Sequence, residues 1–184
     1  MLFCALIVAV SCLSVVANAE QPPIWPLPTK VVLSDDKALV LDQGFKFSTS
    51  ANYGSVIARA MDRYLKLISP PVGSTGPLKN CNIVVVNNAS TPIVGGDETY
   101  SLAVSSNGCE ISANTVWGAL RGLESFTHFL VRGSEPSRVE VVSSSVSVTD
   151  SPRFGHRGML IDTARHYLSV STIQTVIDAL TVSK

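Results

Sequence analysis

Residues 152–168 read PRFGHRGMLIDTARHYL and mark a change of character along this 184-residue chain. Within this stretch, residues 158–162 are almost uniformly apolar, which is typical of a short strand buried on both faces, as in a parallel sheet. Helix signals follow, because Ser171 and Gln174 match a capping box and apolar side chains recur on one face as far as Leu180. We therefore predict one βα unit, with a strand over residues 158–162 and a helix that opens at Ser171.

The polar side chains of this unit gather where the predicted strand ends. Ligands of parallel βα units bind just past the carboxyl ends of the strands, and Asp162, Arg165 and His166 occupy that position. Arg165 offers a planar fork of donors that can grip a carboxylate, a phosphate or two adjacent sugar hydroxyls. Asp162 can bond sugar hydroxyls or hold the guanidinium. The pattern alone leaves two interpretations open, a ligand site or an ion pair that only shapes the loop.

The residues before Pro152 predict a small α+β domain. Apolar stripes with helical spacing cover residues 53–68 and 115–131, and Asn114 is the expected cap of the second helix. Strand patterns cover residues 30–40, 44–48, 82–86, 99–104, 109–113, 139–142 and 146–150. This order predicts a mainly antiparallel sheet with both helices on one face.

Three glycines carry further information about this domain. Asn107-Gly108 supplies the positive-φ turn of a hairpin between residues 99–104 and 109–113. Gly118 and Gly122 lower the helix propensity of residues 115–131, so they indicate that this helix packs closely on the sheet.

The first nineteen residues predict a secretory signal peptide. They carry no charged side chain and end in Ala17-Asn18-Ala19, an A-x-A pattern that favours cleavage after Ala19. An uncleaved membrane anchor or a buried apolar strand is the alternative, although the apolar run is short for a membrane span.

Two cysteines remain after the predicted cleavage, Cys81 and Cys109. In an oxidising compartment they allow a single pairing, and both lie at the start of a predicted strand, where a bridge is geometrically plausible. Two buried free thiols are the alternative. Asn88 opens the chain's one N-glycosylation sequon, in a turn-rich stretch.

Charge and motifs argue against several classes of function. The 14 basic and 14 acidic side chains balance, so no whole-chain field draws the protein to nucleic acid or to an anionic membrane. His156 and His166 flank the predicted strand without a third ligand at metal-like spacing, so neither a metal nor a cofactor is expected. No glycine-rich phosphate loop and no Gly-x-Ser-x-Gly turn occurs. His128 lies among apolar residues, which favours packing over catalysis.

With these residues in view, the chain resembles the β-N-acetylhexosaminidases of glycoside hydrolase family 20, in detail the plant type. The resemblance rests on WPLPTKV at 25–31, DETYSLAV at 97–104, VWGALRGLESFTHFL at 116–130 and FGHRGMLIDTARHYL at 154–168. It implies a signal peptide at residues 1–19, the family's N-terminal α+β domain at 20–151 and the start of its catalytic (β/α)8 barrel at 152–184. Since such a barrel needs about 250 residues, we expect it to be truncated here after its first βα unit.

The resemblance implies an activity and assigns residues to it. The family removes terminal N-acetylglucosamine or N-acetylgalactosamine from glycans with retention, through attack by the sugar's own acetamido oxygen. A Glu serves as general acid and then base, and the neighbouring Asp orients the acetamido group. The family's arginine that grips the terminal sugar matches Arg165, while Asp162 and His166 match flanking positions that support the loop.

The catalytic Asp-Glu pair of the family lies on a later strand, and Asp97-Glu98, which precedes a hairpin strand, is not that pair. We therefore expect a fragment that binds substrate through Arg165 and is inactive alone. A secreted, non-enzymatic α+β binding or structural module is the alternative.

The resemblance also implies the partner and the compartment. The expected partner is a glycan that ends in N-acetylhexosamine, with no cofactor, metal or nucleic acid. The expected location is the secretory pathway and then the apoplast, the extracellular space or the vacuole. The family often dimerises, through surfaces that lie largely beyond Lys184.

Overall fold

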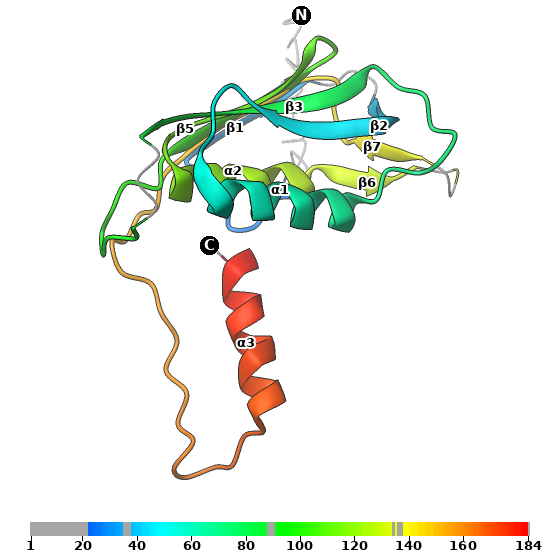
Figure 1. Ribbon diagram of the computed structural model, residues 1–184. Helices are drawn as coiled ribbons and strands as arrows, with labels where there is room; N and C mark the ends of the chain where they lie inside the picture. The colour runs from blue at the N-terminus through cyan, green and yellow to red at the C-terminus, as the bar shows by residue number, and fades with distance from the viewer. Residues whose placement is uncertain (1–21, 35–37, 88–90, 134, 136–137, 184) are drawn as a thin grey trace, which may run out of the picture.

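The computed structural model describes residues 22–34, 38–87, 91–133, 135 and 138–183. In these residues a sheet carries two helices on one face. Residues 151–183 form a C-terminal arm, an irregular segment that ends in a third helix (Figure 1). The elements in chain order are β1 (Lys30–Leu33), β2 (Leu39–Thr49), α1 (Gly54–Ile68), β3 (Leu78–Asn87), β4 (Tyr100–Ser105), β5 (Gly108–Thr115), α2 (Val116–His128), β6 (Leu130–Arg132), β7 (Val139–Val141), β8 (Val146–Asp150) and α3 (Val170–Val182). The predicted α+β domain is confirmed. Among the described helices, none is long and apolar enough to cross a membrane.

The sheet has eight strands in the order β1-β8-β4-β5-β3-β2-β7-β6. Its central strand β3 pairs in parallel with β2 and β5, whereas the other pairings are antiparallel. The parallel centre follows from the chain path, since α1 crosses over between β2 and β3 and parallel neighbours need such a crossover. The sheet is therefore mainly antiparallel, as predicted, around a parallel core.

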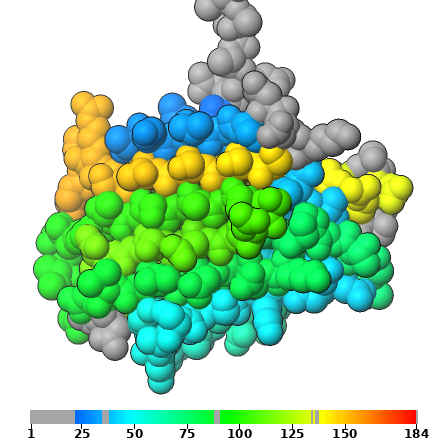
Figure 2. Space-filling model, turned by 90° about the horizontal axis from the view of Figure 1, so that it is seen from above, coloured from blue at the N-terminus to red at the C-terminus, as the bar shows by residue number. Residues whose placement is uncertain are grey.

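No helix of the described residues covers the face of the sheet opposite α1 and α2, and Figure 2 looks down on this open face. Alternation along the strands sends Leu102, Ile111 and Val148 into the core, where each is at most 1% exposed. Their neighbours in sequence point to the open face, where the register aligns Ser101 with both Ser112 and Thr149.

Between the strand patterns predicted at residues 30–40 and 44–48, the chain continues without leaving the sheet. Strand β2 is continuous, and the register with β3 shifts between Leu41 and Lys46, as at a β-bulge. Local bonds satisfy the backbone there, because Gly44 N donates to the Asp42 carboxylate (2.9 Å) and Gln43 N donates to the Ser74 carbonyl (2.8 Å). The gap between the two predicted strands is therefore a bulge within a single strand.

Helix α2 lies directly against the sheet, as its glycines predicted. A Cβ atom at Gly118 would lie 2.4 Å from the Thr99 carbonyl oxygen, and one at Gly122 would lie 2.4 Å from Ile111 Cγ2. Both separations are shorter than any ordinary contact, so only glycine fits at either position without a shift of its neighbours. These two residues set the distance between the helix and β4 and β5.

The ends of α2 differ from the prediction. The cap is Thr115, whose side chain accepts from Gly118 N (3.2 Å), while the Asn114 amide donates to Asp97 (2.7 Å). The helix ends at His128, and residues 130–132 form β6 instead of a last helical turn, because they pair with β7.

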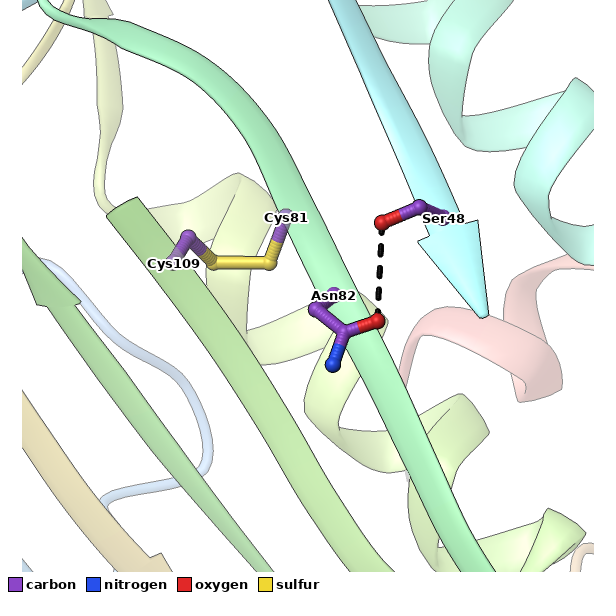
Figure 3. The surroundings of a disulfide bond; sticks show 4 residues. All are labelled: Ser48, Cys81, Asn82 and Cys109. Carbon is purple, nitrogen blue, oxygen red and sulfur yellow. Dashed lines mark hydrogen bonds between the residues drawn. A yellow bond between two sulfur atoms is a disulfide. The ribbon is translucent and has the colours of Figure 1, made fainter. Parts of the chain in front are cut away.

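Cys81 and Cys109 face each other across the parallel pair of β3 and β5, with Cα atoms 4.3 Å apart, and form a disulfide (Figure 3). The predicted pairing is confirmed, and the alternative of two free thiols is wrong. On the neighbouring position of β3, Asn82 points the other way and its amide oxygen accepts from the Ser48 hydroxyl at 3.5 Å.

Beyond β8 the structure departs from the predicted βα unit. Residues 158–162 form no strand, and Met159 and Leu160 are 62% and 88% exposed. A parallel strand needs hydrogen-bonded neighbours, and no strand of the described residues lies alongside this segment. The helix does form, but Ser169 caps it, accepting from Thr172 N at 3.2 Å, instead of the predicted start at Ser171. None of its residues is buried.

Candidate functional site

The C-terminal arm brings two of the three predicted site residues together. Asp162 Oδ1 accepts from the backbone N–H groups of Ala164 (2.9 Å) and Arg165 (3.2 Å), which closes a tight turn. The Arg165 side chain folds back over this turn, and its Nε and Nη2 atoms both donate to Asp162 Oδ2 at 2.5 Å. One carboxylate thus fixes both the backbone and the guanidinium of the same turn.

In this pair the guanidinium group of Arg165 stays exposed to solvent. The Arg165 side chain is 82% exposed and that of Asp162 is 29% exposed. Hydrogen bonds from the Arg165 side chain, and then from the backbone of Ala164 and Arg165, hold the pKa of Asp162 below its usual value. Asp162 is therefore ionised at neutral pH and steers the guanidinium, which has five N–H donors to share between Asp162 and a ligand.

The other residues singled out in the sequence make no hydrogen bond or ion pair with Asp162 or Arg165 among the described residues. His166 follows Arg165 in the same turn and is exposed, as is His156 earlier in the arm. Asn88 lies outside the described residues. His128 lies at the end of α2, away from the arm.

A second cluster of charges lies where the arm leaves the domain, and sequence reasoning did not predict it. Glu98 Oε2 accepts from Arg121 Nε of α2 at 2.6 Å, and Glu98 Oε1 accepts from Arg157 Nη2 of the arm at 2.6 Å. Arg157 also donates through Nη1 to the Phe154 carbonyl at 2.8 Å. Partial burial raises the pKa of Glu98, but the hydrogen bonds from Arg157 and Arg121 outweigh it and bring this pKa below its usual value.

Asp97, the neighbour of Glu98, is engaged in a different way. Its carboxylate accepts from the Thr99 backbone N–H (2.8 Å) and from the Asn114 amide (2.7 Å), and its carbonyl accepts from the Thr115 hydroxyl (2.6 Å). Hydrogen bonds from Thr99 and Asn114 lower the pKa of Asp97. Both acids of this pair thus make contacts that join the start of β4, the start of α2 and the arm.

A third polar cluster is buried between the helices. Glu124 of α2 is 4% exposed, accepts from the Tyr64 hydroxyl of α1 at 2.6 Å and pairs with His128 at 3.1 Å. The other ring nitrogen of His128 accepts from the Trp25 backbone N–H at 3.3 Å. His128 therefore has a structural role, and the spacing of four between Glu124 and His128 on a helix was the available signal.

Two cavities flank the second cluster. One, of about 370 Å³, lies between α1, α2 and the end of α3, with Arg63, Trp117 and Leu180 in its lining. The other, of about 330 Å³, lies between Leu27, Asp150 and Phe154. Glu98 and Arg121 line both. The indole N–H of Trp117 is buried without a hydrogen-bond partner in the described residues.

Two family models match this chain, one over part of the α+β domain and the other over the C-terminal arm. Residues 24–128, which hold five of the eight strands and both packed helices, match the family described as beta-acetyl hexosaminidase like. Residues 154–184, the arm with Asp162 and Arg165, match the catalytic domain of glycosyl hydrolase family 20. These two matches place the chain in a family of glycoside hydrolases.

Individual relatives agree with these matches. The chain is 32% identical to beta-hexosaminidase 1 of Arabidopsis thaliana, over 95% of this chain and 36% of that protein. It is 32% identical to the beta subunit of beta-hexosaminidase of Rattus norvegicus, over 98% of this chain and 36% of that protein. The chain belongs to glycoside hydrolase family 20, and it spans about a third of the length of these relatives.

Solved structures agree in fold. The chitobiase of Flavobacterium johnsoniae superposes with a TM-score of 0.70 at 29% identity, over 87% of this chain and 25% of that one. The β-N-acetylhexosaminidase of Streptomyces coelicolor superposes with a TM-score of 0.64 at 20% identity, over 89% and 33% of the two chains.

Proposed function

We propose that this chain is the N-terminal part of a β-N-acetylhexosaminidase that removes terminal N-acetylglucosamine or N-acetylgalactosamine from glycans. The observation that carries the proposal is the exposed Arg165 fork, held by Asp162 within residues that match the family's catalytic domain. A guanidinium in this state can donate two parallel hydrogen bonds to neighbouring sugar hydroxyls. Arg165 is thus the substrate-binding residue, and Asp162 and His166 support it.

The proposed mechanism is substrate-assisted and retaining. The acetamido oxygen of the sugar attacks the anomeric carbon, while an acid protonates the leaving oxygen and later, as a base, activates water. Asp97-Glu98 does not fill this role, because both carboxylates are engaged, that of Asp97 by Thr99 and that of Glu98 by Arg157 of the arm. We therefore place the catalytic Asp-Glu pair outside these 184 residues, and the chain alone binds sugar without cleaving it.

We also propose that the protein enters the secretory pathway and reaches the apoplast, the extracellular space or the vacuole. The apolar stretch before Glu20 and the Cys81–Cys109 disulfide support this proposal, because disulfides persist in oxidising compartments. N-terminal sequencing of the secreted protein should give a sequence that begins at Glu20. A protein that keeps residues 1–19 would contradict the proposed cleavage.

Hydrolysis of a chromogenic N-acetylglucosaminide tests the catalytic part of the proposal. The 184-residue chain should show no turnover above blank, and the coding sequence after Lys184 should continue in frame to an Asp-Glu pair. The continued chain should hydrolyse the substrate, and Arg165→Ala in it should lower kcat/KM about 100-fold, because a charged hydrogen-bonding partner of the sugar is lost.

Two outcomes would contradict the proposal. Turnover by the 184-residue chain would mean that its acid and base lie within it. A stop codon with no downstream frame, together with a monomeric chain that binds chitooligosaccharide, would favour a non-enzymatic binding module instead.

A further inference from the structure

Glu98 joins the two parts of the chain that match different family models. Glu98 and Arg121 belong to the α+β domain, within residues 24–128, and Arg157 belongs to the arm, within residues 154–184. Glu98 receives one hydrogen bond from each arginine, both at 2.6 Å and one on each carboxylate oxygen. The three side chains are 19% to 31% exposed, so the cluster is only partly open to water.

Contacts of the neighbouring residues hold the backbone of Glu98 in place, independently of its side chain. Asp97 is held by Asn114 and Thr115 at the start of α2. Gly118 packs against the next stretch, and a Cβ there would lie 3.2 Å from the Glu98 carbonyl carbon. The carboxylate therefore projects from a rigid base, and Arg121 turns one of its two oxygens toward α2.

On the arm, Arg157 links Glu98 to the neighbouring backbone. Its Nη1 atom donates to the Phe154 carbonyl at 2.8 Å, which closes a short loop over residues 154–157. A Cβ at Gly155 would lie 3.5 Å from Gly95 Cα, so this loop also touches the segment before Glu98. Five positions after Arg157 comes Asp162, the residue that orients Arg165.

We infer that Glu98 is a positioning residue, which sets where the segment bearing Asp162 and Arg165 leaves the α+β domain by clamping Arg157 against Arg121. Its effect on Arg165 rests on the proposed function, whereas the clamp itself is a structural property of this chain. The α+β domain thereby has a direct part in aligning the sugar-binding arginine.

A distance measurement tests the clamp without any activity. Spin labels on Ser112→Cys, on the open face of the sheet, and Thr163→Cys, beside the Asp162 turn, report how the arm lies relative to the domain, with the native disulfide kept intact. In this background Glu98→Gln and Arg157→Gln should each widen the distance distribution about twofold, because a clamped segment becomes locally mobile. The double variant should widen it no further, and Arg157→Lys, which keeps the charge, should restore most of the narrow distribution.

Arg153→Gln is the matched control. Arg153 lies in the same loop, and its guanidinium is stacked 5.6 Å from the centre of the Phe154 ring, so its loss should leave the distribution narrow. An unchanged distribution in Glu98→Gln would overturn the inference, as would equal widening in Arg153→Gln. Should Glu98→Gln fail to fold, Arg157→Gln examines the same contact from the arm. Failure of the glycosidase assays would leave these results untouched, so the two proposals fail separately.

Discussion

Tyr64 of α1 donates its hydroxyl hydrogen to Glu124 of α2 across a distance of 2.6 Å, and this buried bond joins the two helices on the sheet. Burial is the largest cause that raises the pKa of the Tyr64 hydroxyl, followed by its bond to the Glu124 carboxylate. The hydroxyl therefore stays protonated and remains a donor over the whole physiological range. A carboxylate as buried as Glu124 needs such partners, because an unpaired buried charge is costly.

Removal of the Tyr64 hydroxyl should destabilise the domain. In Tyr64→Phe the ring still fills its place, but Glu124 loses a donor, so the free energy of unfolding should fall by about 1.5–3 kcal/mol. Denaturant unfolding of the oxidised chain measures this change. The control is Tyr53→Phe, which removes a hydroxyl that is hydrogen-bonded to the Ser50 hydroxyl at 2.9 Å, just before α1. A loss of unfolding free energy in Tyr64→Phe no larger than in this control would refute the prediction.

Substitution of Gly122 should reveal how tightly α2 lies on the sheet. The added methyl of Gly122→Ala meets Ile111 Cγ2, and overpacking of this kind costs about 1–3 kcal/mol against a gain in helix propensity of up to about 1 kcal/mol. We expect a net loss of unfolding free energy in thermal or denaturant unfolding. In an Ile111→Ala background the clash with Cγ2 is gone and only the 3.3 Å contact with Tyr100 Cδ2 stays tight, so the same substitution should cost much less. Equal effects in both backgrounds would show that the contact carries no cost.

Loss of the disulfide should weaken the domain without changing its fold. Cys81 and Cys109 are 28 positions apart, and the chain-entropy model assigns a closed loop of this length about 3–4 kcal/mol. The double variant Cys81→Ala/Cys109→Ala should therefore unfold at lower denaturant concentration, with its far-UV circular dichroism retained. Dithiothreitol should shift the natural chain in the same way and leave the variant unaffected, whereas a shift in the variant would point to another cause.

The elements with strong local signals could be predicted from the sequence. Helix α1 carries its apolar stripe within one stretch, and the Asn107-Gly108 pair indicates the hairpin on its own. The turn itself lies one residue earlier than predicted, at Ser106 and Asn107, because Gly108 already pairs with Ser105 in the sheet. The cap of α2 was harder to place, because Asn114 and Thr115 are both good caps and the choice depends on Asp97, which draws the Asn114 amide away. Strand β6 depends on its partner β7, and no local pattern announced that pairing.

The site shows the same division between local and distant contacts. Asp162 and Arg165 are three positions apart, and their pairing was one of the two interpretations that the sequence left open. Glu98 and Arg157 are separated by 59 positions, so nothing in either neighbourhood indicated that they meet. The predicted strand at residues 158–162 was wrong for the related reason that a strand's hydrogen bonds are made to distant chain.

The contribution of Glu98 should depend on pH in a defined direction. Because its pKa is lower in the folded protein than in the unfolded chain, the ionised carboxylate stabilises the fold above the usual pKa of Glu, and this stabilisation is lost as the pH falls through the lower, folded value. The cluster is partly solvent-screened, so its contribution at neutral pH should be about 0.5–1 kcal/mol. Unfolding free energies of the natural chain and of Glu98→Gln should differ by this amount at pH 7 and converge at pH 3. As a control, Glu135→Gln should change the unfolding free energy equally little at both pH values, because Glu135 is exposed and lies outside the Glu98 cluster. A difference that persists or grows at pH 3 would mean that Glu98 acts through its shape and not its charge.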